Sequence, residues 1–418
     1  YMILLSVCRI KSLLPLRGMI LNMMPSPVKK AYNPENIPLL VATASILQIS
    51  ETLLPHPIPG LRFGFANIVS LIILVQYGFK PALTVTLLRT VVSSFILGNF
   101  LSPGFILSFA GGLASICATG ILYRISIRFD FFRVSPVGLG MTGAFVHNMV
   151  QITLAYLILI RLPGIFFLVP WLAFGALIFG AFSGNIATGI IKKLIQKVSI
   201  ESIPIQPVPS YENKIFVEED TLFHKSMPEI KFAIVLGLTL VVVLIENLML
   251  YSFLFAVVLT AIPAAGLQYK TTFKIIRKLS IIILSTFLLP LYFNPGSHIL
   301  IETPYFSLHS EAITSGVVFA SRIILLALFS SILAQTTRTD MFTKGIQTFL
   351  KPFDRIGLNS EYISRTLFLS MISLPEVWDE IRSVIRFLLK GKKRTFKTLK
   401  ETVIQLFVYI FSARNNRP

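Results

Sequence analysis

The stretch Glu51–Ile68, ETLLPHPIPGLRFGFANI, separates two long apolar runs and places polar groups inside both of them. Glu51 precedes the prolines, where its own apolar run still continues, and Asn67 comes after the next run has begun. Turns between membrane helices contain such prolines, because proline restricts the backbone to extended or turn conformations. The polar groups therefore either cap a tight turn or line a site.

The composition predicts an all-α, polytopic membrane protein. Of 418 residues, 54% are hydrophobic and only 14% are charged, whereas about 25% charge is usual in soluble domains. Apolar runs of about 17–25 residues recur, the length that a helix needs to cross a bilayer. The net charge of +19 is typical of basic cytoplasmic loops, so we expect no nucleic-acid partner. Cys8 and Cys117 are too few and too far apart for a disulfide framework.

The apolar runs and the basic loops predict five regions. Residues 1–36 form an N-terminal tail, and residues 37–193 form a six-span domain. Its spans are expected at 38–54, 63–79, 82–101, 104–123, 137–160 and 165–191. Residues 194–228 are proline-bearing and polar, as in a cytoplasmic linker. Residues 229–336 hold four more spans, expected at 230–247, 250–267, 279–293 and 311–334.

Residues 337–418 differ from the rest, since charges alternate with apolar residues at helical spacing. This pattern predicts amphipathic cytoplasmic helices that either lie on the anionic inner leaflet or dock a partner. The basic run YKTTFKIIRK at 269–278 is expected to be an inner loop, and the segment from Asn294 to Glu311, which has no Lys or Arg, an outer one. The positive-inside rule then places both termini in the cytoplasm. We expect the protein to reside in the inner, cytoplasmic membrane of the cell.

Polar side chains fall inside the first six spans at Glu51, Asn67, Arg89, His147, Asn148 and Gln151. A charge in the bilayer core costs about 2.5–3.5 kcal/mol on insertion scales, so such groups face partners or water. At 1.5 Å per residue the set lies between the midplane and the outer leaflet. His147 and Gln151 share one helix face. This placement predicts a binding cavity reached from outside.

A purely structural interpretation remains open for the same residues. Arg89 and Glu51 can pair to neutralise each other, and the amides can join helices. No metal site is predicted, because no carboxylate or cysteine lies near His147 in the sequence. The small residues in GGLAS (111–115) and GALIFGAFSG (175–184) predict close helix packing.

Motifs of catalysis are absent from the sequence. It contains no GxxxxGK[ST] loop for ATP, no Asp-rich pair for Mg²⁺ on a diphosphate and no GxSxG nucleophile. We therefore expect no enzyme activity, no catalytic residue and no cofactor in this chain.

Three stretches of the first half match a known family: ETLLPHPIPGLRFGFAN, SPGFILSFAGGLAS and GAFVHNMVQ. They resemble the Gx transporter family, which is also labelled heptaprenyl diphosphate synthase component I and is similar to the substrate-binding S components of energy-coupling factor transporters. The resemblance implies a six-helix S-like bundle. Its motif includes Glu51, Arg62 and Asn67, which implies that the opening stretch contributes to a site.

The second half resembles the transmembrane T subunit of the same transporters. The resemblance rests on FHKSMPEIKF at 223–232, on residues 321–358 and on SRTLFLSMISLPEVWDEI at 364–381. It implies that separate ATPase subunits, which hold ATP and Mg²⁺, dock on the cytoplasmic helices. The family's Ala-Arg-Gly docking motif is missing here, so Arg382, Arg386 and Arg394 are the candidate contacts.

Three functions follow as hypotheses. The first is a fused S-plus-T transporter protein for a small organic solute in the vitamin, flavin or quinone and isoprenoid precursor classes. The second is a non-catalytic membrane partner of a heptaprenyl diphosphate synthase, and the third is a membrane scaffold. The T-like half disfavours the second, and the polar groups within the spans disfavour the third.

Overall fold

The computed structural model describes residues 34–52, 64–195, 221–293, 298–303, 306–389 and 396–413. Within these ranges the regular secondary structure is helical apart from one antiparallel hairpin, β1 (Ile299–Thr303) and β2 (Phe306–His309). The hairpin lies in the segment predicted as an outer loop, and the sequence analysis did not predict it. The prediction of an all-α polytopic membrane protein is otherwise confirmed.

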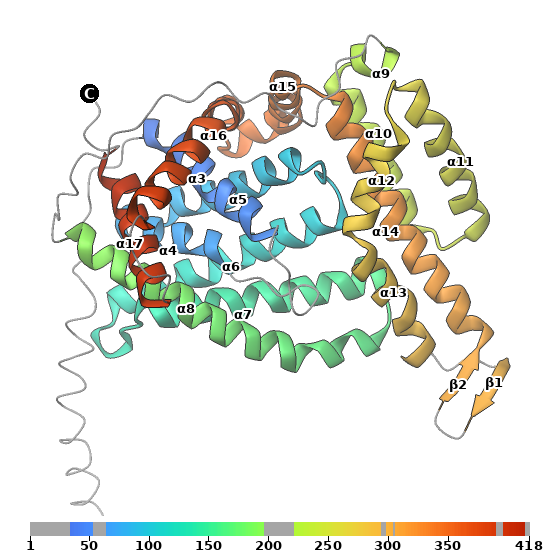
Figure 1. Cartoon of the computed structure of the whole chain (residues 1–418), viewed down its shortest axis with the longest axis horizontal. Helices are drawn as coiled ribbons and strands as arrows, with labels where there is room; N and C mark the ends of the chain where they lie inside the picture. Colours follow the sequence, from blue (N-terminus) through green and yellow to red (C-terminus); the bar gives the residue numbers. More distant parts are fainter. Residues whose placement is uncertain are drawn as a thin grey trace, which may run out of the picture.

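The N-terminal bundle is the set of helices from α3 to α8, which Figure 1 shows in blue to green. Its elements are η1 (Pro34–Asn36), α3 (Ile37–Thr52), α4 (Phe65–Tyr77), α5 (Phe79–Ile96), α6 (Pro103–Arg128), η2 (Asp130–Phe132), α7 (Pro136–Leu154), the π-helix η3 (Ala155–Ile160), η4 (Pro163–Leu168) and α8 (Val169–Ile195). Helices α6 and α7 both begin with Ser-Pro. In each, the serine hydroxyl accepts a backbone N–H of the first turn and proline occupies the first helical position, which is the arrangement that favours helix initiation.

The C-terminal region runs from yellow-green to red in Figure 1. It comprises α9 (Leu222–Lys225), α10 (Pro228–Leu244), α11 (Leu248–Ala264), α12 (Tyr269–Lys278), α13 (Ser280–Phe293), the hairpin, α14 (Ser310–Thr336), α15 (Thr339–Leu350), η5 (Lys351–Ile356), α16 (Ser360–Leu389) and α17 (Phe396–Ala413). The segment 269–278, predicted as an inner connection between two spans, lies between α11 and α13. YKTTFKIIRK forms the amphipathic helix α12, because its apolar residues recur at helical spacing.

The ten predicted spans all coincide with helices. Five helical segments within the described residues are long and apolar enough to cross a membrane: Phe79–Ile96, Pro103–Arg128, Pro136–Ile160, Pro163–Leu194 and Ser310–Thr336. The other five predicted spans correspond to α3, α4, α10, α11 and α13, which are shorter. The 13 residues of α4 extend over roughly 20 Å, less than the ~30 Å hydrocarbon core. Ten crossings therefore stay a prediction.

Glycines let α7 and α8 approach each other closely, as the small-residue pattern predicted. A Cβ added at Gly140 would lie 2.5 Å from the carbonyl oxygen of Gly180. A Cβ added at Gly184 would lie 2.5 Å from the Cα of Val137. Any side chain at these positions would push the two backbones apart, so glycine is required by this packing.

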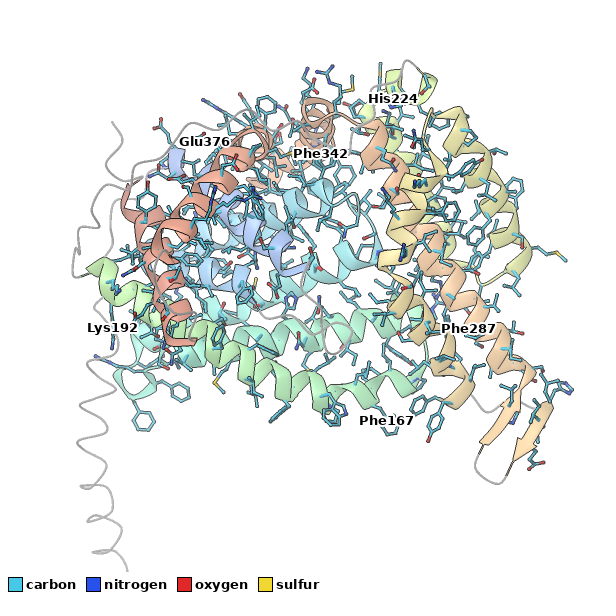
Figure 2. All side chains as sticks on the ribbon, in the orientation of Figure 1. Phe167, Lys192, His224, Phe287, Phe342 and Glu376 are labelled. Atoms are coloured by element: carbon cyan, nitrogen blue, oxygen red, sulfur yellow. The ribbon has the colours of Figure 1, made fainter. Side chains whose placement is uncertain are left out.

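The amphipathic helices of the C-terminal region pack on the N-terminal bundle. Helix α16 contacts α3 and α5, and α17 contacts α8. Phe342 of α15, labelled in Figure 2, is fully buried. The centre of its ring lies 3.9 Å from the centre of the Phe95 ring in α5. Helices α15, α16 and α17 are amphipathic, as predicted, and part of their apolar surface packs on the N-terminal bundle.

A second junction joins the two parts at the end of α7. Arg322 of α14 is completely buried, and its guanidinium donates to the carbonyl oxygen of Leu159 in η3 at 2.6 Å and to Glu246 Oε1 at 3.0 Å. The same carboxylate oxygen accepts a hydrogen bond from Arg161 at 3.2 Å. Glu246 thus neutralises one arginine from each part of the chain.

The two parts do not run parallel. In Figure 1 the long helices α7 and α8 run across helices α13 and α14 instead of along them. In this arrangement the pair α7 and α8 and the pair α13 and α14 cannot both be parallel to the bilayer normal. The depths predicted above for the polar groups assume an upright N-terminal bundle and remain predictions.

Candidate functional site

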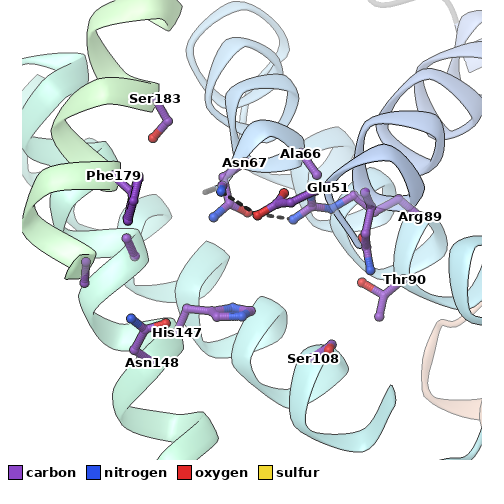
Figure 3. Close-up of a pocket in the computed structure, with 14 residues that line it drawn as sticks. Glu51, Ala66, Asn67, Arg89, Thr90, Ser108, His147, Asn148, Phe179 and Ser183 are labelled. Carbon is purple, nitrogen blue, oxygen red and sulfur yellow. Dashed lines mark hydrogen bonds between the residues drawn. The ribbon is translucent and has the colours of Figure 1, made fainter. Parts of the chain in front are cut away.

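A small polar cavity lies inside the N-terminal bundle. Five of the predicted site residues line it: Glu51 from α3, Asn67 from α4, Arg89 from α5, and His147 and Asn148 from α7 (Figure 3). Four helices that are distant in sequence therefore bring their polar side chains to one place. Glu51, Arg89, His147 and Asn148 are all buried.

Glu51 fixes the start of the next helix as well as lining the cavity. Its Oε1 accepts a hydrogen bond from the backbone N–H of Gly64 at 2.8 Å, directly before α4 begins. Gly64 has φ = 78°, a left-handed conformation that glycine adopts without strain. Glu51 therefore both holds the start of α4 and lines the cavity. Arg62 and the three prolines lie outside the described residues.

Arg89 is held by Asn67. Its Nη2 donates to Asn67 Oδ1 at 2.7 Å, a short charge-assisted bond between α5 and α4. The Ser70 and Thr86 hydroxyls join the same two helices at 2.8 Å. Glu51 thus bonds to the backbone of Gly64, whereas Arg89 bonds to Asn67.

Helix α7 supplies the opposite wall. Asn148 donates from Nδ2 to the carbonyl oxygen of Leu172 in α8 at 3.0 Å, which fixes its amide in the cavity. His147 and Gln151 lie on one face of α7, as predicted, since a Cβ at Gly111 would be 3.0 Å from the first and 3.1 Å from the second. Gln151 does not line the cavity.

Several lining residues were not predicted from the sequence. The cavity is also bordered by Gln48, Thr90, Ser108, Phe179 and Ser183. Gln48 lies one helical turn before Glu51, and this spacing could have identified it. Ser and Thr are ambiguous, because in membrane helices they commonly hydrogen-bond to their own backbone, as Thr90 does to Thr86.

The cavity is small in this conformation. The space open to the centre of a water molecule is about 40 Å³, enough for roughly three waters. Pockets that enclose a drug-sized ligand measure about 300–1,000 Å³. A vitamin-sized solute therefore requires this bundle to open.

Two of the candidate docking arginines, Arg382 and Arg386, lie on α16. Arg382 and Arg386 are both exposed and stand one turn apart on α16. The Arg382 guanidinium stacks on Trp378 at 5.5 Å from the ring centre, which holds the side chain in place. Arg394 lies outside the described residues.

Two family models match the two parts of the chain. The model described as "Heptaprenyl diphosphate synthase component I" matches residues 40–190, and the model described as "Cobalt transport protein" matches residues 219–413. The boundary between the matches falls at the linker expected from the sequence.

Curated relatives resemble part of the chain. The "Energy-coupling factor transporter transmembrane protein EcfT" of Macrococcus caseolyticus is 23% identical over 200 residues, which cover 47% of this chain and 76% of the relative. The protein of that name from Bacillus selenitireducens is 22% identical over 170 residues, 41% of this chain and 63% of the relative. The one from Brevibacillus brevis is 23% identical over 204 residues, 47% of this chain and 77% of the relative.

The fold and these matches define a multi-pass helical membrane protein of the transporter-component class. More particularly, the chain fuses a component-I-like N-terminal part, resembling the Gx transporter family, to a C-terminal part that resembles an energy-coupling factor T subunit. The matches support a membrane component of such a transporter over a partner of a prenyl synthase.

Proposed function

We propose that this chain binds a small organic solute in the N-terminal bundle and couples its movement to ATPase subunits that dock on α15–α17. The cavity offers both charges and amides, inside a bundle whose core is mostly apolar. ATP and Mg²⁺ belong to the docked subunits in this proposal, and both termini of the chain face them from the cytoplasm.

One observation carries the coupling. Helix α16, which bears Arg382 and Arg386, packs directly on α3 and α5. These two helices carry Glu51 and Arg89. A movement of α16 by a docked ATPase would therefore be transmitted to the two charged groups of the cavity through direct helix contacts.

The solute is expected to be a vitamin, a flavin or a quinone or isoprenoid precursor with polar groups. Arg89, Asn67, Asn148 and His147 can satisfy carbonyl, hydroxyl or anionic groups, and Phe179 can cover an apolar or aromatic portion. The enlargement needed for entry couples binding to a rearrangement of the helices around the cavity.

Solute binding is tested by mass spectrometry of small molecules retained by the purified full-length protein. Arg89→Gln and Glu51→Gln should each lower retention by roughly 10–100-fold, because each removes one charged hydrogen-bonding group from the site. Arg124→Gln, at an exposed position on α6, serves as the control. Retention that is equal in all four proteins, with native-like thermal stability, would exclude the cavity as the site.

ATPase docking is tested by co-purification from the membrane. Arg382→Lys and Arg386→Lys keep the charge but lose the planar fork that binds carboxylates and carbonyls in pairs. Loss of the ATPases in these variants supports a specific groove contact, whereas loss only in the Glu variants indicates diffuse attraction. A soluble prenyl synthase in place of ATPases would instead establish the synthase-partner function.

A further inference from the structure

An apolar groove lies between α10 and α15, away from the polar cavity. Phe232, Leu236 and Leu240 of α10 and Phe349 of α15 form most of its lining, together with Ala233, Gly237, Glu229 and Thr348. Its volume is about 330 Å³, and an apolar cavity of ~150 Å³ already accommodates benzene. The groove is therefore large enough for a segment of hydrocarbon chain.

Gly237 keeps the groove open. Glycine inside a helix lowers the helix stability by roughly 1 kcal/mol relative to alanine. A helical glycine is therefore usually found where a neighbouring element packs too closely for a side chain. A Cβ at Gly237 would meet no atom within 4 Å. The contrast is with Gly345 of α15, where a Cβ would lie 2.6 Å from the Phe232 ring. Gly345 permits helix packing, whereas Gly237 leaves space that the protein does not fill.

The groove is continuous with an exposed apolar surface of α10. Along α10, Ile230, Ile234 and Leu240 are 51%, 56% and 52% exposed. Lys231 Nζ donates to the carbonyl oxygen of Thr336 at 2.7 Å, which joins the start of α10 to the end of α14. Both helix ends lie on the cytoplasmic side in the proposed topology. The groove thus opens from the lipid-facing side of α10 at the level of the inner leaflet.

Basic side chains lie close in sequence to the α15 residues that line the groove. Lys344 precedes Thr348 by one helical turn, and Lys351 and Arg355 follow in η5; all three are exposed. The acidic Glu229 is engaged by the Thr348 hydroxyl at 3.0 Å. An anionic headgroup above the groove would therefore meet three cations near the membrane surface.

The turn after α15 is built to present apolar groups beside these cations. Asp354 accepts hydrogen bonds from the backbone N–H and the hydroxyl of Ser360, both at 2.7 Å, which fixes η5 against the start of α16. Phe353 and Ile356 are nevertheless 44% and 76% exposed. Exposed apolar residues flanked by Lys and Arg are typical of segments that bind at a lipid interface.

We propose that the groove between α10 and α15 binds one acyl chain of an anionic phospholipid from the inner leaflet, with the headgroup at Lys344, Lys351 and Arg355. The bound lipid covers the open face at Gly237 and anchors the first coupling helix to the bilayer. The site is independent of the solute cavity, so it stands whether or not that cavity binds solute.

The test uses the full-length protein in phosphatidylcholine vesicles that contain phosphatidylglycerol with a photoreactive group on one acyl chain. After irradiation, cross-links to α10 and Phe349 are mapped by mass spectrometry. They are normalised to cross-links at Met249 and Phe253 of α11, which are 84% and 64% exposed and report ordinary surrounding lipid. The native protein should show the groove labelled above this reference.

Gly237→Leu places an apolar side chain at the groove, and its Cβ would meet no atom within 4 Å, so groove labelling should fall to the reference level while the thermal stability is kept. Gly104→Leu is the matched control, since a Cβ there has its nearest neighbour at 3.8 Å. Gly237→Ala, a smaller change, should give an intermediate loss. Labelling that is unchanged in Gly237→Leu, or that never exceeds the α11 reference in the native protein, would overturn the proposal.

The headgroup is tested with the phosphatidylcholine analogue of the same probe. Each lysine should favour the anionic lipid by about fivefold, so Lys344→Gln and Lys351→Gln together should abolish most of the preference. If both probes label the native groove equally, the assignment to an anionic lipid is wrong.

Discussion

Replacing Arg322 by leucine should destabilise the protein and loosen the junction between its two parts. Of its hydrogen bonds, those to the Leu159 carbonyl at 2.6 Å and to Glu246 at 3.0 Å are the shortest. Hydrogen bonds to charged groups contribute about 1.5–3 kcal/mol each. The Glu246 side chain is 41% exposed, and water can replace part of its bond. We therefore expect a loss of about 3 kcal/mol, at the low end of the 3–5 kcal/mol typical of broken buried pairs.

Thermal unfolding in detergent, followed by tryptophan fluorescence, measures this loss. For a chain of this length, 3 kcal/mol corresponds to a decrease in Tm of roughly 3–4 °C. Arg161→Leu is the control, because Arg161 bonds to the same Glu246 oxygen but its side chain is 40% exposed, which limits its contribution to about 1 kcal/mol. Equal effects of the two substitutions would refute the argument from burial.

Three further predictions follow from other features. Gly140→Leu should prevent close packing of α7 on α8 and cost about 3 kcal/mol or more, measured as a lower Tm, because a Cβ there lies 2.5 Å from a backbone carbonyl oxygen of α8. The hydrogen bonds from Ser360 lower the pKa of Asp354 below its usual value, which is near 3.9. The Asp354 carboxylate therefore stabilises the folded state at pH values above about 3.9, and this stabilisation is lost as the pH falls through the lowered pKa of the folded state. The stability difference between the native protein and Asp354→Asn should thus vanish in acid, and a difference that persists unchanged would contradict this account. A cysteine at position Ser307 should react with an impermeant reagent added from outside, whereas a cysteine at Ser210 should react only after the cells are permeabilised. The reverse result would show that the predicted topology is inverted.

The sequence by itself determined the class of protein and the position of its helices. Apolar runs of sufficient length and low charge predict membrane helices. Unpaired backbone groups are costly in hydrocarbon, and a helix pairs them all within its own segment. Ser102 and Ser135, each followed by proline, mark helix starts through local hydrogen bonds that need no tertiary contact.

Most of the candidate site was also predictable, since a charge or amide inside an apolar run is expensive anywhere except near a partner. That rule selected Glu51, Asn67, Arg89, His147 and Asn148, and the structure places them around one cavity. Their pairing was not predictable. Which group Arg89 bonds depends on how α4 and α5 are rotated against each other, and this rotation is set by packing.

The tertiary structure alone decided how the two parts of the chain meet. The amphipathic pattern of α16 and α17 showed an apolar face but not its partner, because bilayer and protein surfaces are equally apolar. Arg322 is the clearest case: in the sequence it is one cation in a long apolar run, and only the fold brings Glu246 and the end of η3 to it. The sequence shows which polar groups are costly to bury. The hydrogen bonds that offset this cost join segments more than a hundred residues apart, such as Arg322 and Leu159, which only folding brings together.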